Sequence, residues 1–141
     1  MKYAIIYWSR YGNGKKIVEH LEGKLKEKGA ETQMFTTGEA NPAAMPEADV
    51  YIFSAPTEAF KIQTNMRTFL KKLEGMDNKK YGIINTHGMK KNRLNKMETL
   101  LSKKKMLKIA ESEFHVGKNA NTGNDLMEGW ETKLDEFAGK L

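Results

Sequence analysis

The 141 residues suit a single domain, and a chain of this length can bury a core without covalent cross-links. Cysteine is absent, which excludes disulfides, thiolate metal sites and cysteine nucleophiles. The apolar run at 4–8 is too short for a membrane span or a signal sequence, so we expect a cytoplasmic protein without membrane insertion. The net charge of +6 predicts an acidic partner.

Strand-like and helical patterns alternate along the chain. Apolar runs predict buried strands at 2–8, 49–54 and 80–85, an alternating run predicts a strand at 31–36, and a looser strand is expected at 106–115. Apolar residues at helical spacing predict a helix after each strand except the second, because 38–48 has room for only a turn or two. The last helix is expected to run from Leu126 to Leu141, with Thr122 or Asn124 as its N-cap.

This alternation predicts an α/β fold over a single domain, residues 1–141. Five strands with right-handed crossovers suit a three-layer, doubly wound, five-stranded parallel sheet of order 2-1-3-4-5. In that order the switch point, where the strand order reverses, lies between the first and third strands. Ligands are therefore expected beyond the carboxyl ends of those strands, next to the loop after the fourth.

The first of these loops, Ser9-Arg-Tyr-Gly-Asn-Gly-Lys15, combines a hydroxyl, two glycines and basic residues at a helix N-terminus. Free backbone N–H groups and the helix dipole favour an anion there, although a plain glycine-rich turn is the alternative. The Walker A pattern fails at Ser9 and Lys16, and the dinucleotide fingerprint needs a glycine where Ile17 stands. Nucleotide hydrolysis and dinucleotide binding are thus disfavoured.

Three motifs in order resemble the flavodoxin family. Ser9 to Gly14 resembles its phosphate loop, Ala48 to Thr57 its third strand and the following loop, and Ile83 to Gly88 its fourth strand and loop. The resemblance covers essentially the whole chain and matches the short form. The family binds FMN noncovalently and carries electrons one at a time. The resemblance therefore implies a flavodoxin-like electron carrier with FMN as cofactor, rather than a classical enzyme.

The resemblance assigns FMN binding to three loops. They are the phosphate loop (Ser9, Arg10, Tyr11, Gly12, Asn13 and Gly14), the second loop (Ala55, Pro56, Thr57, Glu58, Ala59 and Phe60) and the third loop (Asn85, Thr86, His87 and Gly88). Gly14 replaces the family's usual Thr, so we expect weaker FMN binding. The second loop lacks the family's Trp and Gly, and the third lacks its Tyr, which leaves Phe60, His87 and Met89 as candidates to contact the ring. Trp8 is interpreted as core.

Members of this family are typically acidic, whereas this chain is basic. Lys90, Lys91 and Arg93 are expected to rim the flavin edge and to steer an acidic, ferredoxin-like redox partner. The alternative is a flavin-dependent NAD(P)H or quinone reductase on the same fold, for which the chain has little spare length. A nucleic-acid-binding module is disfavoured, because the basic residues are spread over several helices without an aromatic stripe.

Overall fold

The computed structural model describes residues 1–88 and 91–141. In chain order the elements are β1 (Lys2–Tyr7), α1 (Asn13–Glu27), β2 (Glu31–Thr36), β3 (Val50–Glu58), β4 (Lys61–Ile62), α2 (Thr64–Lys72), β5 (Lys80–His87), α3 (Leu94–Ser102), β6 (Leu107–His115), a 3₁₀ turn (Ala120–Thr122) and α4 (Trp130–Ala138).

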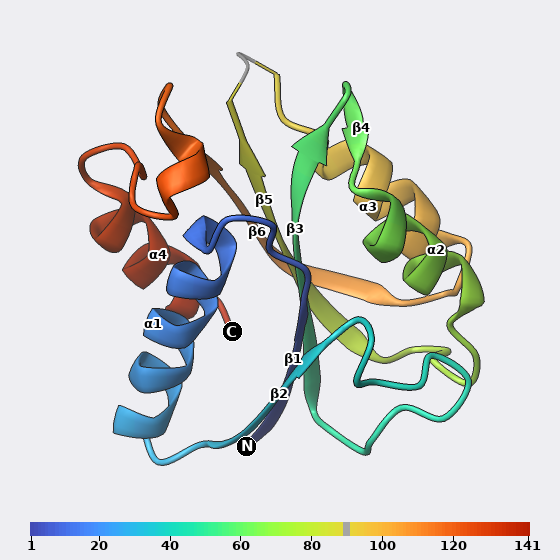
Figure 1. The fold of residues 1–141 in the computed structure, drawn as a ribbon. Coiled ribbons are helices and arrows are strands. Elements are labelled where there is room, and N and C mark those ends of the chain that lie inside the picture. Colours follow the sequence, from blue (N-terminus) through green and yellow to red (C-terminus); the bar gives the residue numbers. More distant parts are fainter. Residues whose placement is uncertain (89–90) are drawn as a thin grey trace.

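Five parallel strands form the sheet in the order β2-β1-β3-β5-β6 (Figure 1). With the short β4 set aside, this order is the predicted 2-1-3-4-5, so the fold prediction is confirmed. Ile5 of β1 lies between Met34 of β2 and Ile52 of β3 in the register. The direction of strand progression therefore switches between β1 and β3, as in other doubly wound sheets.

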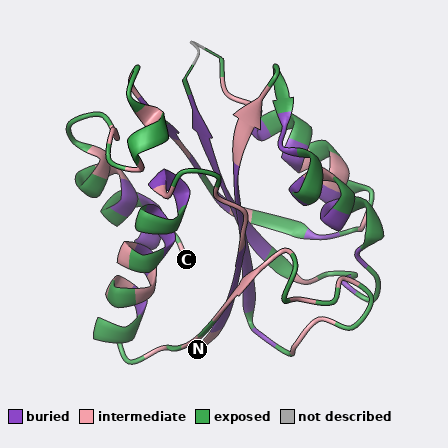
Figure 2. Cartoon of the chain, in the orientation of Figure 1, coloured by how far each residue is buried: buried purple, intermediate pink, exposed green. Residues whose placement is uncertain are grey.

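Helices cover both faces of the sheet, α1 and α4 on one side and α2 and α3 on the other (Figure 1). Alternate residues of β3 serve the two cores: Tyr51 and Phe53 pack with α2 and α3, while Val50 and Ile52 pack with α1 and α4. The central strands are buried on both faces (Figure 2). Such burial explains why the sequence shows continuous apolar runs here instead of alternation.

Gly82 of β5 allows α4 to approach the sheet closely. A Cβ atom at this position would lie 2.9 Å from Cζ of Phe137 and 3.3 Å from a methyl group of Leu141. The pairing of β5 with β6 also shifts register between Tyr81 and Gly82. The missing side chain thus leaves a depression in the sheet that the ring of Phe137 fills.

The β3–β4 hairpin was not predicted. Strand β3 continues past Ser54 to Glu58, and β4 then pairs with it antiparallel through Glu58 and Lys61. The two residues between the strands, Ala59 and Phe60, have φ of 48° and 65°. Two-residue hairpins of type I′ need positive φ at both central positions, usually from Asn-Gly. Because Ala and Phe give no such signal, sequence patterns could not find this turn.

The predicted start of the last helix is wrong. Helix α4 begins at Trp130 after Gly129, whose φ is 87°, and Leu126 instead forms an isolated antiparallel bridge with Val116. Thr122 belongs to the 3₁₀ turn, where its hydroxyl donates to the carbonyl of Asn119 at 2.7 Å. Leu126, which its apolar spacing had assigned to the helix, therefore packs within the connection after β6. Residues 38–48 form turns and no helix.

Candidate functional site

A pocket of about 200 Å³ opens at the carboxyl edge of the sheet, where the fold prediction placed the ligand. Its walls come from four loops: Trp8, Ser9, Arg10, Tyr11, Asn13 and Gly14 after β1; Pro56, Thr57 and Glu58 of β3; Thr86, His87 and Gly88 at the end of β5; and Val116, Gly117 and Ala120 after β6. Five predicted site residues lie outside this lining: Gly12, Ala55, Ala59, Phe60 and Asn85.

The phosphate loop presents the free end of a helix. Gly12 is the N-cap of α1 with φ of 109°, no side chain caps the helix, and its first turn has no acidic residue. The N–H groups of the first three helical residues, Asn13, Gly14 and Lys15, lack intrahelical acceptors by geometry. The Ser9 hydroxyl accepts from the N–H of Gly12 at 3.1 Å and keeps its own proton to donate. This donor set fits an anion.

Ser54 is a buried polar side chain next to the phosphate loop. Its side chain is 1% exposed, and within the described residues its Oγ has no hydrogen-bond partner. Its backbone carbonyl accepts from Trp8 N–H at 3.0 Å, which places Ser54 beside the start of the phosphate loop. Ser54 is not among the residues that line the pocket, so its hydroxyl lies behind the site.

A fourth loop supports the phosphate loop, and sequence reasoning missed it. Asn13 is buried, and its Nδ2 donates to the carbonyl of Ala120 at 2.8 Å while its Oδ1 accepts from the N–H of Asp125 at 3.1 Å. Gly123, with φ of 72°, lies so close that a Cβ atom would overlap the carbonyl oxygen of Tyr11. Asn13 therefore ties two loops together in addition to lining the pocket.

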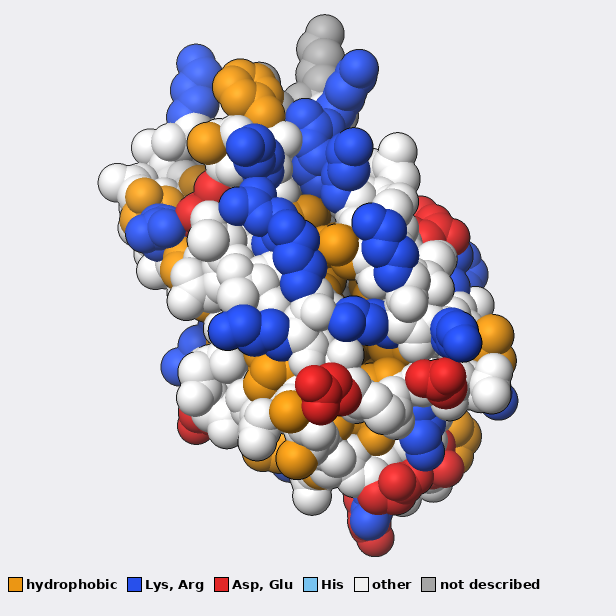
Figure 3. Space-filling view, turned by 90° about the vertical axis from the view of Figure 1, so that its right-hand side faces the viewer, with side chains coloured by type: hydrophobic (Ala, Val, Ile, Leu, Met, Phe, Trp, Pro, Cys, Tyr) orange, Lys and Arg blue, Asp and Glu red, His pale blue; other side chains and the backbone are white. Residues whose placement is uncertain are grey.

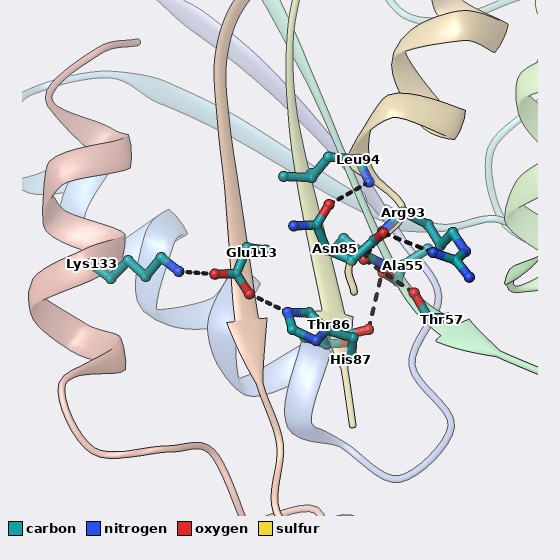
Figure 4. A network of polar contacts seen from close by, with 10 residues as sticks. Ala55, Thr57, Asn85, Thr86, His87, Arg93, Leu94, Glu113 and Lys133 are labelled. Carbon is teal, nitrogen blue, oxygen red and sulfur yellow. Dashed lines mark hydrogen bonds and ion pairs between the residues drawn. The ribbon is translucent and has the colours of Figure 1, made fainter. Parts of the chain in front are cut away.

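Asn85 organises the opposite side of the pocket (Figure 4). This fully buried side chain accepts from the N–H of Arg93 at 2.7 Å and from Thr57 Oγ1 at 3.1 Å, and its Nδ2 donates to the carbonyl of Ala55 at 3.0 Å. It links the end of β3, the end of β5 and the start of α3. The structure thus places the predicted ligand residue Asn85 behind the pocket wall, as a connector of the loops.

His87 lines the pocket and is held from behind by charged groups (Figure 4). Its Nε2 contacts Glu113 of β6, which also accepts a hydrogen bond from Lys133 of α4 at 2.5 Å. Burial alone would raise the pKa of Glu113, but the hydrogen bonds from Lys133 and His87 outweigh it and lower that pKa below its usual value. His115 stacks edge-on against His87 at 5.5 Å between ring centroids. The predicted site residue His87 is thus fixed in orientation.

Arg10 and Glu58 bridge the mouth of the pocket. The guanidinium donates to both carboxylate oxygens of Glu58, at 2.6 and 2.8 Å, and lies over the Trp8 ring at 4.8 Å from its centroid. This fork connects the phosphate loop to β3. Trp8 is half-buried and lines the pocket, so its interpretation as core is wrong. Because the ion pair is largely exposed, it adds little to the stability of the fold.

Phe60 points away from the pocket. Its side chain is 62% exposed, and its carbonyl accepts from Nε of Arg93 at 2.7 Å. The hydrogen bond holds the hairpin against the start of α3, while the ring lines a separate groove between α2 and α3. Of the other ring-contact candidates, His87 lies in the pocket wall and Met89 lies outside the described residues, as does Lys90 of the predicted rim.

Residues 1–88 and 91–141 contain neither a metal-binding cluster nor a membrane-spanning helix. No group of three or more His, Cys, Asp or Glu side chains is arranged to hold a metal ion. No helix combines the length and the hydropathy that crossing a bilayer requires.

Comparison with known proteins assigns the family. The flavodoxin domain model matches residues 4–122, so the chain belongs to the flavodoxin family, whose members bind flavin, typically FMN. The flavodoxin of Streptococcus pneumoniae TIGR4 superposes with a TM-score of 0.82 at 19% identity, covering 100% of this chain and 97% of its own. Two-electron reduced flavodoxin of Megasphaera elsdenii gives 0.78 at 18% identity, with 99% of each chain covered. No curated protein matches the chain.

A longer protein also contains this fold. A variant of the flavo di-iron protein from Thermotoga maritima gives a TM-score of 0.70 at 25% identity, covering 99% of this chain and 34% of that chain. The free helix end and the Ser9 hydroxyl fit the phosphate ester that FMN carries, because both offer donors to an anion. The donor chemistry of the pocket and the family assignment thus point to the same cofactor class.

Proposed function

We propose that the protein is an FMN-binding electron carrier that shuttles low-potential electrons between redox proteins. The single observation that carries the proposal is the anion cradle: the uncapped N-terminus of α1 together with the Ser9 hydroxyl that lines the pocket beside it. Both features favour a phosphate group at the end of the sheet where flavodoxin-like folds bind ligands. Bound FMN supplies the chemistry by accepting and donating electrons one at a time.

The chain's residues have separable roles in this function. Ser9 and the N–H groups of the first turn of α1 bind the phosphate, while Asn13 keeps that turn against the fourth loop. Pro56, Thr57 and His87 form the walls on the ring side of the pocket. No residue of the pocket needs to exchange a proton with a substrate, because the carrier transfers electrons alone.

The proposed partner is an acidic redox protein of ferredoxin-like charge. Lys91 and Arg93 follow the third loop, and the chain carries a net charge of +6. Complementary charge raises the rate of encounter and this effect weakens with salt. Electron exchange with an acidic carrier should therefore slow as ionic strength rises, and a flat salt profile would contradict the partner proposal.

The test of the proposed function is FMN binding and its dependence on Ser9. Titration of FMN with the protein should quench flavin fluorescence with one-to-one stoichiometry. Ser9→Ala should weaken FMN binding by at least about tenfold, since a hydrogen bond to a charged group contributes about 1.5–3 kcal/mol. The same variant should bind riboflavin, which has no phosphate, as the wild-type protein does.

Two outcomes would overturn the proposal. If excess FMN produces neither a heat of binding in calorimetry nor quenching of flavin fluorescence, the carrier function is contradicted. Oxidation of NAD(P)H with a quinone by the FMN-loaded protein alone, at rates typical of enzymes, would instead favour the flavin-dependent reductase.

A further inference from the structure

The outer face formed by α2 and α3 carries a groove of about 550 Å³ that is separate from the cofactor pocket. Five basic side chains line it, and no Asp or Glu is among its described lining residues: Lys61, Arg67, Lys71, Lys96 and Lys103. Figure 3 shows Lys and Arg side chains gathered over this face of the molecule, with hydrophobic atoms between them. The groove is therefore a concentrated positive patch.

The cations of the groove are not neutralised within the described chain. None of the five takes part in an ion pair there, whereas cations elsewhere on the surface pair with carboxylates, as Lys79 does with Glu47 and Lys108 with Glu98. Clustered like charges repel one another, and an external anion relieves that repulsion. The charge pattern thus indicates a negatively charged occupant.

Helix electrostatics do not explain all of these cations. Lys71 lies in the last turn of α2, where the dipole favours positive charge. Lys96 lies in the first turn of α3, and Arg67 follows the first turn of α2; neither helix has an acidic residue in its first turn. Positive charge at a helix N-terminus is locally unfavourable. Lys96 therefore stands at a position where the dipole of its own helix disfavours a positive charge.

An exposed aromatic side chain marks the end of the groove next to the pocket. Phe60 lines the groove, and the hairpin that carries it also contributes Pro56, Thr57 and Glu58 to the pocket wall. Its backbone is left-handed and is fixed by Arg93, so the ring is presented with its 62% exposure in a defined place. Half-buried Leu100 adds apolar surface inside the groove. An exposed aromatic beside cations suits an apolar residue within an acidic protein surface.

We infer that the α2–α3 groove is the docking surface for an acidic redox protein, which places its carboxylates on the five cations and an apolar side chain against Phe60. A partner seated there touches the hairpin that walls the cofactor pocket, so docking and electron exchange occur at adjacent surfaces. The identity of the partner as a redox protein rests on the proposed function. A protein is favoured over a nucleic acid because the groove presents one aromatic ring and mainly lysines, without an aromatic series for stacking bases.

The test uses the FMN-loaded protein and a reduced [2Fe–2S] ferredoxin of net negative charge, which loses one electron as the bound FMN gains one. The double variant Lys71→Glu, Lys96→Glu should slow the second-order exchange at low salt by at least about tenfold and flatten its salt dependence. The matched control, Lys28→Glu with Lys140→Glu, makes the same change in net charge with exposed residues at the ends of α1 and α4. It should change the rate by less than about twofold.

Phe60→Ala should weaken ferredoxin binding in calorimetry severalfold while leaving the salt dependence intact. Equal effects of the groove variant and the control would overturn the inference, because net charge alone would then explain binding. Tighter binding of a single-stranded oligonucleotide, lost in the groove variant, would overturn it in favour of a nucleic acid. Calorimetry with oxidised ferredoxin and the cofactor-free protein separates the two proposals. If the protein binds ferredoxin through the groove but does not bind FMN, the docking surface is supported and only the carrier function is contradicted.

Discussion

A buried asparagine holds each side of the cofactor pocket together, but the loops around the two asparagines differ in how far they are exposed. On the phosphate side, Asn13 joins the start of α1 to the loop after β6, and Gly123 packs directly against Tyr11. On the ring side, Asn85 joins β3, β5 and α3, but the hairpin above it ends in two left-handed residues and an exposed Phe60.

This contrast follows from the ligand that each side is proposed to hold. A phosphate group needs donors in fixed positions, and cross-linked loops provide them before the ligand arrives. A surface that receives a partner protein needs exposure, and exposed residues add little to the stability of the fold. The pocket thus has one side specialised for binding the cofactor and one side whose outer edge is available for contact with another protein.

The largest expected effect comes from Gly123→Ala. The new Cβ would overlap the carbonyl of Tyr11, so the phosphate loop or its neighbour must move, and unfolding free energy should fall by about 3–4 kcal/mol. Gly75→Ala is the control, because its φ of 69° is similar and nothing lies within 4 Å. It should cost only the left-handed strain of about 1–2 kcal/mol. Urea denaturation measures both; equal losses would contradict the close approach.

The two asparagines can be compared directly. Asn85→Ala leaves several buried partners unsatisfied, and we expect it to lower the unfolding free energy by about 3 kcal/mol. Asn13→Ala should cost about 2 kcal/mol and should also weaken FMN binding, because its loop carries the phosphate donors. Exposed Asn121→Ala is the control and should change neither quantity. A larger loss of FMN affinity in the Asn85 variant than in the Asn13 variant would reverse the proposed division of roles.

Gly14→Ser should strengthen the phosphate side. A Cβ atom at Gly14 would sit 3.6 Å from Ser9 Oγ, an ordinary contact, so the larger residue fits. Its hydroxyl adds a donor to the phosphate, and a gain of about 1.4 kcal/mol corresponds to tenfold tighter FMN binding. Gly14→Ala adds the methyl group alone and should leave the dissociation constant unchanged. Equal affinities of the Ser and Ala variants in fluorescence titration would refute the hydrogen bond.

Replacing Ala59 and Phe60 by Asn and Gly should stabilise the hairpin. Each non-glycine residue in the left-handed region costs about 1–2 kcal/mol, and Asn-Gly is the preferred pair for such turns. We expect a gain of about 1 kcal/mol, equivalent to a rise of roughly 2–4 °C in the melting temperature. Phe60→Ala keeps the strain and should melt with the wild-type protein. A lower melting temperature in the double variant would show that the Phe60 ring packs more than its exposure indicates.

The smallest effect concerns pH. The folded protein lowers the pKa of Glu113 below its unfolded value of about 4.3, so the carboxylate stabilises the fold above that pH and loses this effect as pH falls through the lowered pKa. The stability difference between wild-type and Glu113→Gln proteins should be constant above about pH 5 and shrink below it. A difference that stays constant down to pH 3 would contradict the lowered pKa.

The sequence predicted the sheet and the position of the pocket because both depend on patterns that recur along the chain. Apolar runs such as 49–54 and 80–85 mark doubly buried strands, and their order places the loops at one edge. The phosphate loop was recognisable because glycines follow a hydroxyl at a helix start. The family resemblance assigned the neighbouring loops as ligand-binding segments.

Individual side chains were less predictable, since their roles depend on contacts between distant segments. Arg10 reaches Glu58, 48 positions away, and Asn13 reaches Asp125, 112 positions away. Phe60 was expected near the cofactor because its loop was, but the two-residue turn sends its ring into the α2–α3 groove. The loop after β6 was missed because its residues suggested a helix cap, whereas Gly129 delays α4 to Trp130.

Gly82 affects more than the core. Phe137 fills the depression above it, and this contact sets how closely α4 lies on the sheet. The same helix carries Lys133, which holds Glu113, and Glu113 in turn holds His87 at the pocket wall. A methyl group added deep in the sheet would therefore be expected to reorient an imidazole at the ligand site. Selection for a cofactor environment can thus act on a residue that no ligand ever touches.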